Sequence, residues 1–173
     1  MSVERQAIGS GDTLYTPEQR QRRDETGWTL VQGILAPLQF LAFAISLVFV
    51  VNFLINGSGF FAATVSVLVK TGFLYAIMIT GAIWEKIVFG RYLFARAFFW
   101  EDVVSMGVIA LHTLYVAMWI GSWGSQATQM WLALAAYGAY LINALQFLMK
   151  FQLAKRQPDY SGAVAVAVAE GAH

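Results

Sequence analysis

The sequence predicts an all-α integral membrane protein, a bundle of four transmembrane helices with both termini cytoplasmic. Three observations predict this class. Hydrophobic residues make up 58% of the chain and charged residues only 12%, against about a quarter charged in a soluble domain. The apolar residues form four stretches, each close to the roughly 20 residues that cross a bilayer. Almost all basic residues lie in segments that a four-span topology places on one side of the membrane.

The chain divides into three parts. Residues 1–27 form a cytoplasmic tail and a juxtamembrane helix, which begins at segment 16–19, TPEQ, because this segment combines an N-cap threonine, a proline at the first helical position and a capping-box glutamine. Residues 28–150 form the membrane domain, and residues 151–173 a second cytoplasmic tail whose low complexity predicts disorder over most of it. The predicted spans are 28–55, 62–83, 103–120 and 127–149.

The positions of the basic residues predict the orientation. Ten of the eleven Lys and Arg residues lie in the N-terminal tail, in the 84–102 connection or at the C-terminal end. The connections 56–61 and 121–126 carry none. Because cytoplasmic loops are enriched in Lys and Arg, both termini and the 84–102 connection are predicted to be cytoplasmic.

The 84–102 connection, WEKIVFGRYLFARAFFWED, has an unusual composition. It holds six of the 21 charged residues together with seven aromatic residues. Aromatic side chains are typical of the interface between headgroups and hydrocarbon. The segment is therefore interpreted as the cytoplasmic mouth of a site, where acids, bases and flat rings meet.

Polar residues inside the spans are candidates for a site or a cavity. Lys70 and His112 fall near mid-bilayer, where ionisable groups are costly. A helical face of the third span carries a stripe that runs from a carboxylate to an imidazole and two aromatic rings: Glu101, Ser105, Val108, His112, Tyr115 and Trp119. Each of these residues could instead have a structural role. His112 could form one interhelical hydrogen bond, Lys70 could be a structural counter-ion, and the amides of Gln39 and Asn143 could join neighbouring helices.

Several kinds of site are excluded. The chain has no cysteine, and only one of its two histidines lies in a span. This excludes disulfides, thiolate sites, multi-histidine metal sites and bis-histidine haem. No phosphate loop, dinucleotide fingerprint or hydrolase motif is present. What remains is an apolar cavity with carboxylates, one histidine and a basic rim. Such a cavity suits a large, flat substrate with an acidic tail, and acid–base chemistry without a cofactor.

Several long segments resemble the 2-vinyl bacteriochlorophyllide hydratase family. They are LYTPEQRQRRD (14–24), WTLVQGILAPLQF (28–40), the 84–102 segment, SM (105–106) and ALHTLYVA (110–117). The resemblance implies a hydro-lyase of bacteriochlorophyll biosynthesis in the cytoplasmic or intracytoplasmic membrane of a phototrophic bacterium. Water would add across the C3 vinyl group of chlorophyllide a or 3-vinyl bacteriochlorophyllide, giving a 3-(1-hydroxyethyl) group that a dehydrogenase later converts to acetyl.

The resemblance also implies partners. These are the chlorophyllide substrate, which brings its own magnesium, the membrane lipid and other pigment-synthesis enzymes. No cofactor and no nucleic acid are expected.

Residue roles follow from the chemistry. Protonating a vinyl group needs an acid, and the resulting cation needs a nearby carboxylate and a placed water. The candidate catalytic residues are Glu85, Glu101, Asp102 and His112, with His112 either orienting water or serving as axial ligand to the substrate magnesium. The substrate propionate is expected at Arg91, because arginine pairs bidentately with a carboxylate. The other substrate-binding candidates are Lys86, Arg96, Trp84, Trp100, Ser105, Gln39 and Asn143.

Alternative interpretations stay open. Asp102 suits the capping of a helix N-terminus, and Arg91 and Arg96 suit lipid headgroups. The chain could also be a non-catalytic pigment-binding or assembly protein that holds the pigment through His112. A small-molecule transporter is less favoured, because it would need a membrane-embedded carboxylate and the two ionisable residues near mid-span, Lys70 and His112, are both basic.

Overall fold

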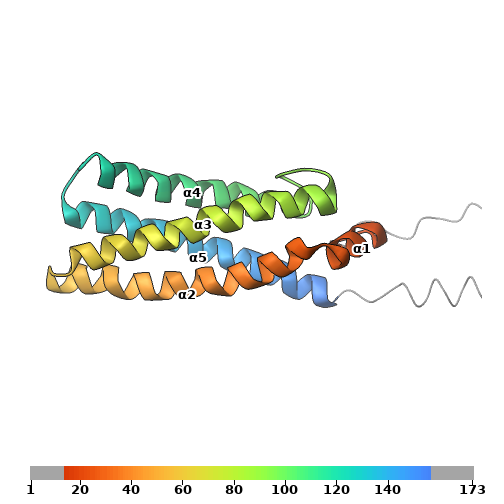
Figure 1. The fold of residues 1–173 in the computed structure, drawn as a ribbon, viewed down its shortest axis with the longest axis horizontal. Helices are drawn as coiled ribbons and strands as arrows, with labels where there is room; N and C mark the ends of the chain where they lie inside the picture. The colour runs from red at the N-terminus through yellow and green to blue at the C-terminus, as the bar shows by residue number, and fades with distance from the viewer. Residues whose placement is uncertain (1–13, 157–173) are drawn as a thin grey trace, which may run out of the picture.

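The computed structural model describes residues 14–156, which are helical with short connections and contain no strand. Four of the helices are long and apolar enough to cross a membrane, which confirms the predicted all-α class with four spans (Figure 1). The tails at 1–13 and 157–173, including the predicted disorder, lie outside the described residues. In chain order the helices are α1 (Pro17–Glu25), α2 (Gly27–Asn56), α3 (Phe60–Phe89), α4 (Phe99–Ile120) and α5 (Gln126–Arg156).

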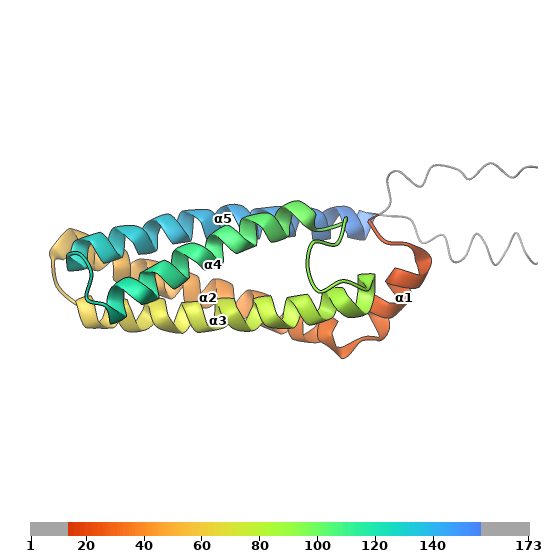
Figure 2. The same ribbon diagram turned by 90° about the horizontal axis from the view of Figure 1, so that it is seen from above.

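The long helices form two antiparallel hairpins. The most extensive helix contacts join α2 to α3 and α4 to α5, while contacts of α2 with α5 and of α3 with α4 hold the hairpins together. The α2–α3 and α4–α5 turns lie at one end, which we call the uncharged end. The loop 90–98 and α1 lie at the other, which we call the charged end. Figure 2 shows α3 and α4 diverging toward the charged end, where loop 90–98 crosses between them.

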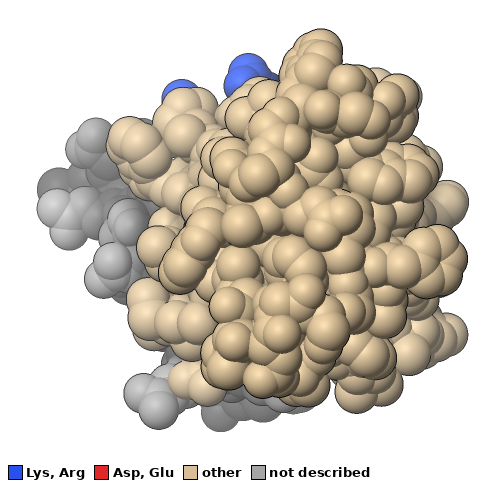
Figure 3. Space-filling view, turned by 90° about the vertical axis from the view of Figure 1, so that its left-hand side faces the viewer, with Lys and Arg blue, Asp and Glu red and all other residues tan. Residues whose placement is uncertain are grey.

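The names of the two ends describe their surfaces. The face seen from the uncharged end shows no Asp or Glu, and Lys or Arg only at its margin (Figure 3). Along the bundle, large apolar side chains are exposed, for example Leu30, Val48 and Ile55 of α2 at 68%, 68% and 75%. A soluble protein rarely leaves so much contiguous apolar surface uncovered, and helices that face lipid are expected to do so.

Three helices extend further at the charged end than predicted. α5 runs to Arg156 rather than to residue 149, so the first residues of the predicted C-terminal tail are helical. α3 continues past the predicted end at residue 83 to Phe89, where Gly90 closes it in the left-handed conformation at φ 80°. α4 begins at Phe99 rather than at 103. Hydropathy ends a span at its first charges, but charged and aromatic residues continue a helix into the interface. The connection is therefore loop 90–98, half the predicted length, and Glu85 lies within α3 rather than at its end.

The N-terminus of α1 is capped by the predicted capping box. The side chain of Thr16 accepts from the backbone N–H of Gln19, and the Gln19 side chain accepts from the backbone N–H of Thr16, with Pro17 at the start. A capping box satisfies two backbone donors that would otherwise lack partners. It fixes the direction in which the chain enters the charged end, and α1 packs on α3 there.

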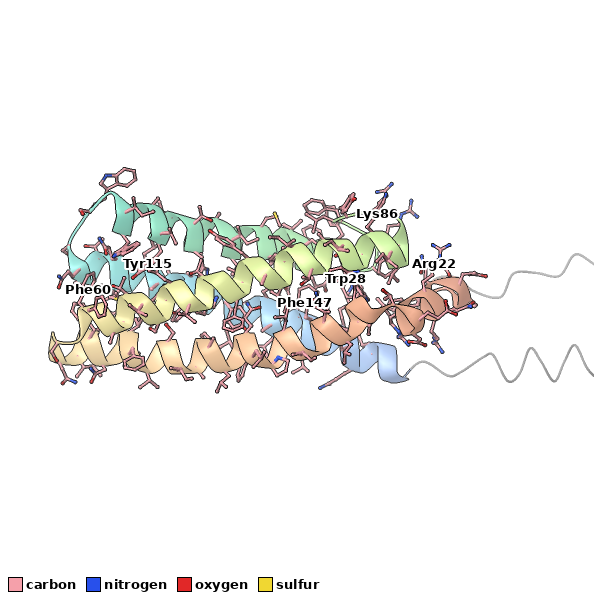
Figure 4. The ribbon with its side chains drawn as sticks, in the orientation of Figure 1. Arg22, Trp28, Phe60, Lys86, Tyr115 and Phe147 are labelled. Atoms are coloured by element: carbon pink, nitrogen blue, oxygen red, sulfur yellow. The ribbon has the colours of Figure 1, made fainter. Side chains whose placement is uncertain are left out.

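Aromatic rings fill the charged end between α3, α5 and the segment before α1. We call Tyr15, Trp84, Phe89, Phe98 and Phe147 the aromatic cluster. Phe98 lies at its centre, 1% exposed, with ring centroids of all four others within 6.5 Å. In Figure 4 the labelled Trp28 and Phe147 lie at this end, and Phe60 and Tyr115 lie toward the other. Stacked and edge-on rings hold the N-terminal segment against the bundle.

Tyr15 gives the aromatic cluster a measurable pH dependence. Burial raises the pKa of Tyr15 to about 12, although the Arg23 guanidinium 4.9 Å above its ring opposes this. Because the folded pKa exceeds the unfolded value of 10.0, the stability contribution is complete below pH 10 and is lost as pH rises toward 12, by up to about 3 kcal/mol. Comparing unfolding of wild type and Tyr15→Phe across this range checks it, since the variant should lack that part of the decline. Parallel curves for the two proteins would contradict it.

Candidate functional site

Three carboxyl groups are buried together at the charged end. Glu85 projects from the last turns of α3, and Glu101 and Asp102 from the first turn of α4. They are 5%, 5% and 2% exposed. We call them the carboxyl cluster. Acids in a first helical turn complement the helix dipole, which explains why α4 begins with them, but not why three acids are buried side by side.

Glu85 and Asp102 lie next to each other and hold loop 90–98. Glu85 Oε2 accepts from the N–H of Ala95 at 3.3 Å, and Asp102 Oδ2 from the N–H of Phe94 at 2.6 Å. Among the described residues, no Lys or Arg forms an ion pair with either acid.

Glu101 has different surroundings from this pair. Its backbone carbonyl accepts from Ser105 Oγ at 2.8 Å and from Asn143 Nδ2 at 2.9 Å. Its carboxylate Oε2 is buried without a hydrogen bond, and the nearest cation is Lys150 Nζ at 3.5 Å. Glu101 and Asp102 are close enough for their carboxyl groups to interact electrostatically. The cluster therefore combines two neighbouring acids that hold the loop with one carboxylate that pairs with a lysine.

Loop 90–98 is strained where the cluster holds it. Phe94 adopts φ 60°, a left-handed conformation that side chains other than glycine rarely take. Such a residue costs on the order of 1–3 kcal/mol and persists only when its surroundings hold it. The hydrogen bond to Asp102 and the contact with the Phe99 ring, at 5.8 Å between centroids, supply that support.

His112 lies deeper in the bundle and has a lysine partner. Its Nδ1 is 2.8 Å from the carbonyl oxygen of Val108, and its Nε2 is 2.6 Å from Lys70 Nζ. A carbonyl only accepts, so Nδ1 carries the hydrogen and Nε2 accepts from the amine. Lys70 also lies 4.2 Å from the centre of the Tyr140 ring, and both Lys70 and His112 are fully buried.

This pair is separate from the carboxyl cluster. Eleven residues of helix between Glu101 and His112 correspond to about 16 Å, too far for both to act on one vinyl group. His112 has no ring nitrogen free for magnesium while Lys70 is bonded to it. The predicted stripe is buried from Glu101 through Tyr115, as its spacing indicated, but Trp119 is 41% exposed.

The predicted binding residues lie in different places. Ser105, Asn143 and Gln39 are buried, and Trp84 is 8% exposed and donates its indole N–H to Thr29 Oγ1 at 2.9 Å. The others lie on the surface of the charged end: Lys86, Arg91, Arg96 and Trp100. Trp100, at 69% exposed, does not stack with Trp84 in this structure.

A groove opens elsewhere, between α2 and α3 on the flank of the bundle. It has a volume of about 530 Å³, and Ser66 is the one hydroxyl among its apolar lining residues, such as Leu38, Phe49 and Phe73. None of the predicted site residues lines it. The predicted cavity that joins carboxylates to a histidine therefore does not correspond to this groove.

Sequence reasoning missed two features of the site. Lys150 was read only as an orientation signal, although it lies seven residues after Asn143 and so on the same face of α5. The three acids lie near the ends of two candidate spans rather than in a loop, which residue order alone did not indicate.

The fold and this site define a four-span helical membrane protein with a buried acid cluster at one end. The family model described as 2-vinyl bacteriochlorophyllide hydratase matches residues 15–153. A protein of that name from Rhodobacter capsulatus is 63% identical over 149 residues, 86% of each chain. Its namesake from Cereibacter sphaeroides is 64% identical over 143 residues, 82% of this chain and 88% of the relative. No solved structure matches. The chain belongs to the 2-vinyl bacteriochlorophyllide hydratase family.

Proposed function

We propose that the protein adds water to the C3 vinyl group of chlorophyllide a or 3-vinyl bacteriochlorophyllide at the carboxyl cluster. Family membership and close relatives make the chain a hydratase, a hydro-lyase of bacteriochlorophyll biosynthesis. The place of the reaction and the role of each residue are the proposal. The observation that carries it is the burial of Glu85 and Asp102 next to each other, each bonded to the backbone of loop 90–98 and, among the described residues, neither paired with a cation.

The reaction needs one proton and one water. The acid gives its proton to the terminal vinyl carbon, and the π electrons form the new C–H bond. Positive charge then develops on the adjacent carbon and is shared with the macrocycle. A water oxygen bonds to that carbon and loses a proton to a carboxylate, which leaves the 1-hydroxyethyl group. Both proton transfers are of the kind that positioned side chains accelerate by about 10²–10⁴-fold.

The two parts of the cluster suit the two halves of this reaction. The Glu85–Asp102 pair supplies the proton, because two neighbouring buried carboxyl groups cannot both carry a charge at low cost. Glu101 stabilises the cation and takes the proton of the water, because its buried Oε2 has a free acceptor site. Asp102 interacts with both neighbours, so the proton can return from Glu101 to the pair and close the cycle.

Substrate binding requires loop 90–98 to move. The cluster is covered by this loop and by the aromatic cluster, and Phe98 is 1% exposed. The strain at Phe94 favours a second loop conformation once Asp102 releases it. The macrocycle then stacks against Trp84, and Trp100 lies at the rim. The propionate pairs with Arg91, supported by Lys86 and Arg96 on the same exposed edge.

The remaining predicted residues act at a distance from the vinyl group. Ser105 and Asn143 fix the backbone of Glu101. Gln39 lies on the buried face of α2. His112 orders the middle of the bundle through Lys70, and it reaches substrate magnesium only if the amine gives up Nε2.

The function is tested with membranes that contain the protein. Incubation with chlorophyllide a is expected to give a product heavier by one water molecule, with its absorption shifted to the blue. Solvent enriched in heavy oxygen should label the new hydroxyl group. Pigment that binds and is recovered unchanged would instead identify a pigment-binding or assembly protein.

The orientation is part of the proposal. The charged end, with both termini, faces the cytoplasm of a bacterial inner membrane, supported by the gathering of basic residues there. The chain has no cysteine, so a single cysteine introduced at Gly57 or at Tyr92 is the only thiol that a membrane-impermeant reagent can label. We expect Gly57→Cys to be labelled from the periplasmic side and Tyr92→Cys from the cytoplasmic side. Labelling of Tyr92→Cys from the periplasm would contradict this orientation and show that the charged end faces the periplasm.

A further inference from the structure

We propose that Lys150 is a positioning residue of the hydratase, which holds Glu101 as the ion-paired carboxylate of the cluster and so separates its role from that of the Glu85–Asp102 pair. The inference rests on the proposed function of the carboxyl cluster and adds a residue to it.

The contacts of Lys150 converge on the start of α4. Its Nζ lies 3.5 Å from Glu101 Oε2, an oxygen that is buried without a hydrogen bond. The same ammonium donates to the backbone carbonyl of Ala97 and lies 5.7 Å from the centre of the Phe98 ring. One side chain thus contacts the loop, the aromatic cluster and the carboxylate at once.

The helix α5 holds Glu101 at two points. Asn143 donates to its backbone carbonyl at 2.9 Å, and Lys150, two turns later on the same face, approaches its carboxylate. The backbone and the side chain of Glu101 are therefore both held by contacts from α5, whereas Glu85 and Asp102 are bonded to loop 90–98. When the loop moves, the hydrogen bond from Asn143 still holds the backbone of Glu101, and Lys150 can keep its contact with the carboxylate while it releases Ala97.

The ion pairs of the cluster also distinguish Glu101 from Glu85 and Asp102. Among the described residues, Lys150 is the one cation that pairs with a member of the cluster. A buried carboxylate is costly unless paired, so the lysine stabilises the charged form of Glu101 where it must face the developing cation. Lys150 does not touch the vinyl group in this scheme and acts through Glu101.

The test is a double-mutant cycle in hydratase turnover. Lys150→Gln removes the charge but keeps a donor for Ala97, and it is expected to lower kcat by roughly 10²-fold, the effect of a misplaced reacting group, with KM nearly unchanged. Lys150→Arg should recover most of the rate. In the Glu101→Gln background, Lys150→Gln should cause no further loss. Arg22→Met removes an exposed charge at the same end and should behave as wild type.

Each outcome decides a different point. Losses that multiply in the double variant would show that Lys150 acts independently of Glu101 and would overturn the inference, as would a raised KM with normal kcat or no recovery by arginine. Full activity of Glu101→Gln would instead remove Glu101 from the proposed function, and absence of turnover in wild type would remove the function itself. Lys150→Met serves in the same cycle if Lys150→Gln does not assemble, as judged by thermal unfolding in detergent.

Discussion

Glu85→Gln is expected to lower the kcat of hydration by about 10²–10⁴-fold, because the variant removes one of the two acids that are proposed to supply the proton. Glutamine has nearly the same shape, and its amide oxygen still accepts from the N–H of Ala95. The loop should therefore stay in place and the fold should survive. The measurement is the initial rate of product formation from chlorophyllide a at saturating substrate, with thermal unfolding of the same preparations.

The partner acid gives the internal check on this result. Because both acids are proposed to supply the proton, Asp102→Asn should reduce kcat to a similar degree. Glu18→Gln provides the matched control, since Glu18 is exposed on α1, and it should be as active as wild type. Turnover close to wild type in both cluster variants would show that the acid lies elsewhere.

His112→Leu is expected to destabilise the folded protein by about 3 kcal/mol, because it leaves the buried amine of Lys70 without its acceptor. Lys70→Met should also destabilise, since His112 Nε2 then lacks a donor. The double variant should recover much of the loss, because replacing both partners by apolar groups removes the unsatisfied atoms together. Unfolding free energies in mixed micelles, measured for all four proteins, form the cycle.

A surface variant of the same helix controls for changes in detergent binding. Thr113 is exposed on α4 next to His112, and its hydroxyl is hydrogen-bonded to Tyr75 of α3 at 2.7 Å. Thr113→Ser keeps this hydroxyl and should change stability by less than about 0.5 kcal/mol. If the losses of His112→Leu and Lys70→Met simply add in the double variant, the two residues do not act as a pair.

Much of the fold could be predicted from the sequence because membrane insertion depends on local averages. A run of apolar residues specifies a span, and the distribution of Lys and Arg separates the two ends. The face of α4 that carries Glu101, Ser105 and His112 also follows from helical spacing alone, and it is buried as expected. These properties require no knowledge of which helix packs against which.

The site could be predicted only in part, because its contacts join distant segments. Counting charges assigned Glu85 and Asp102 to a loop and its edges, whereas the fold brings them together from the ends of two helices. Spacing placed His112 in the interior but could not show that Lys70 occupies its Nε2. Residue type alone also gave no sign that Phe94 carries backbone strain.

The pairing of Lys70 with His112 has a consequence for how the protein is made. The amine belongs to the first hairpin and the imidazole to the second, so when the helices enter the bilayer in chain order, α3 enters before its partner. A lone lysine at the centre of a span disfavours insertion by about 3 kcal/mol, and the apolar remainder of α3 must outweigh it. Docking of the second hairpin then removes that penalty, which ties assembly of the bundle to arrival of the imidazole.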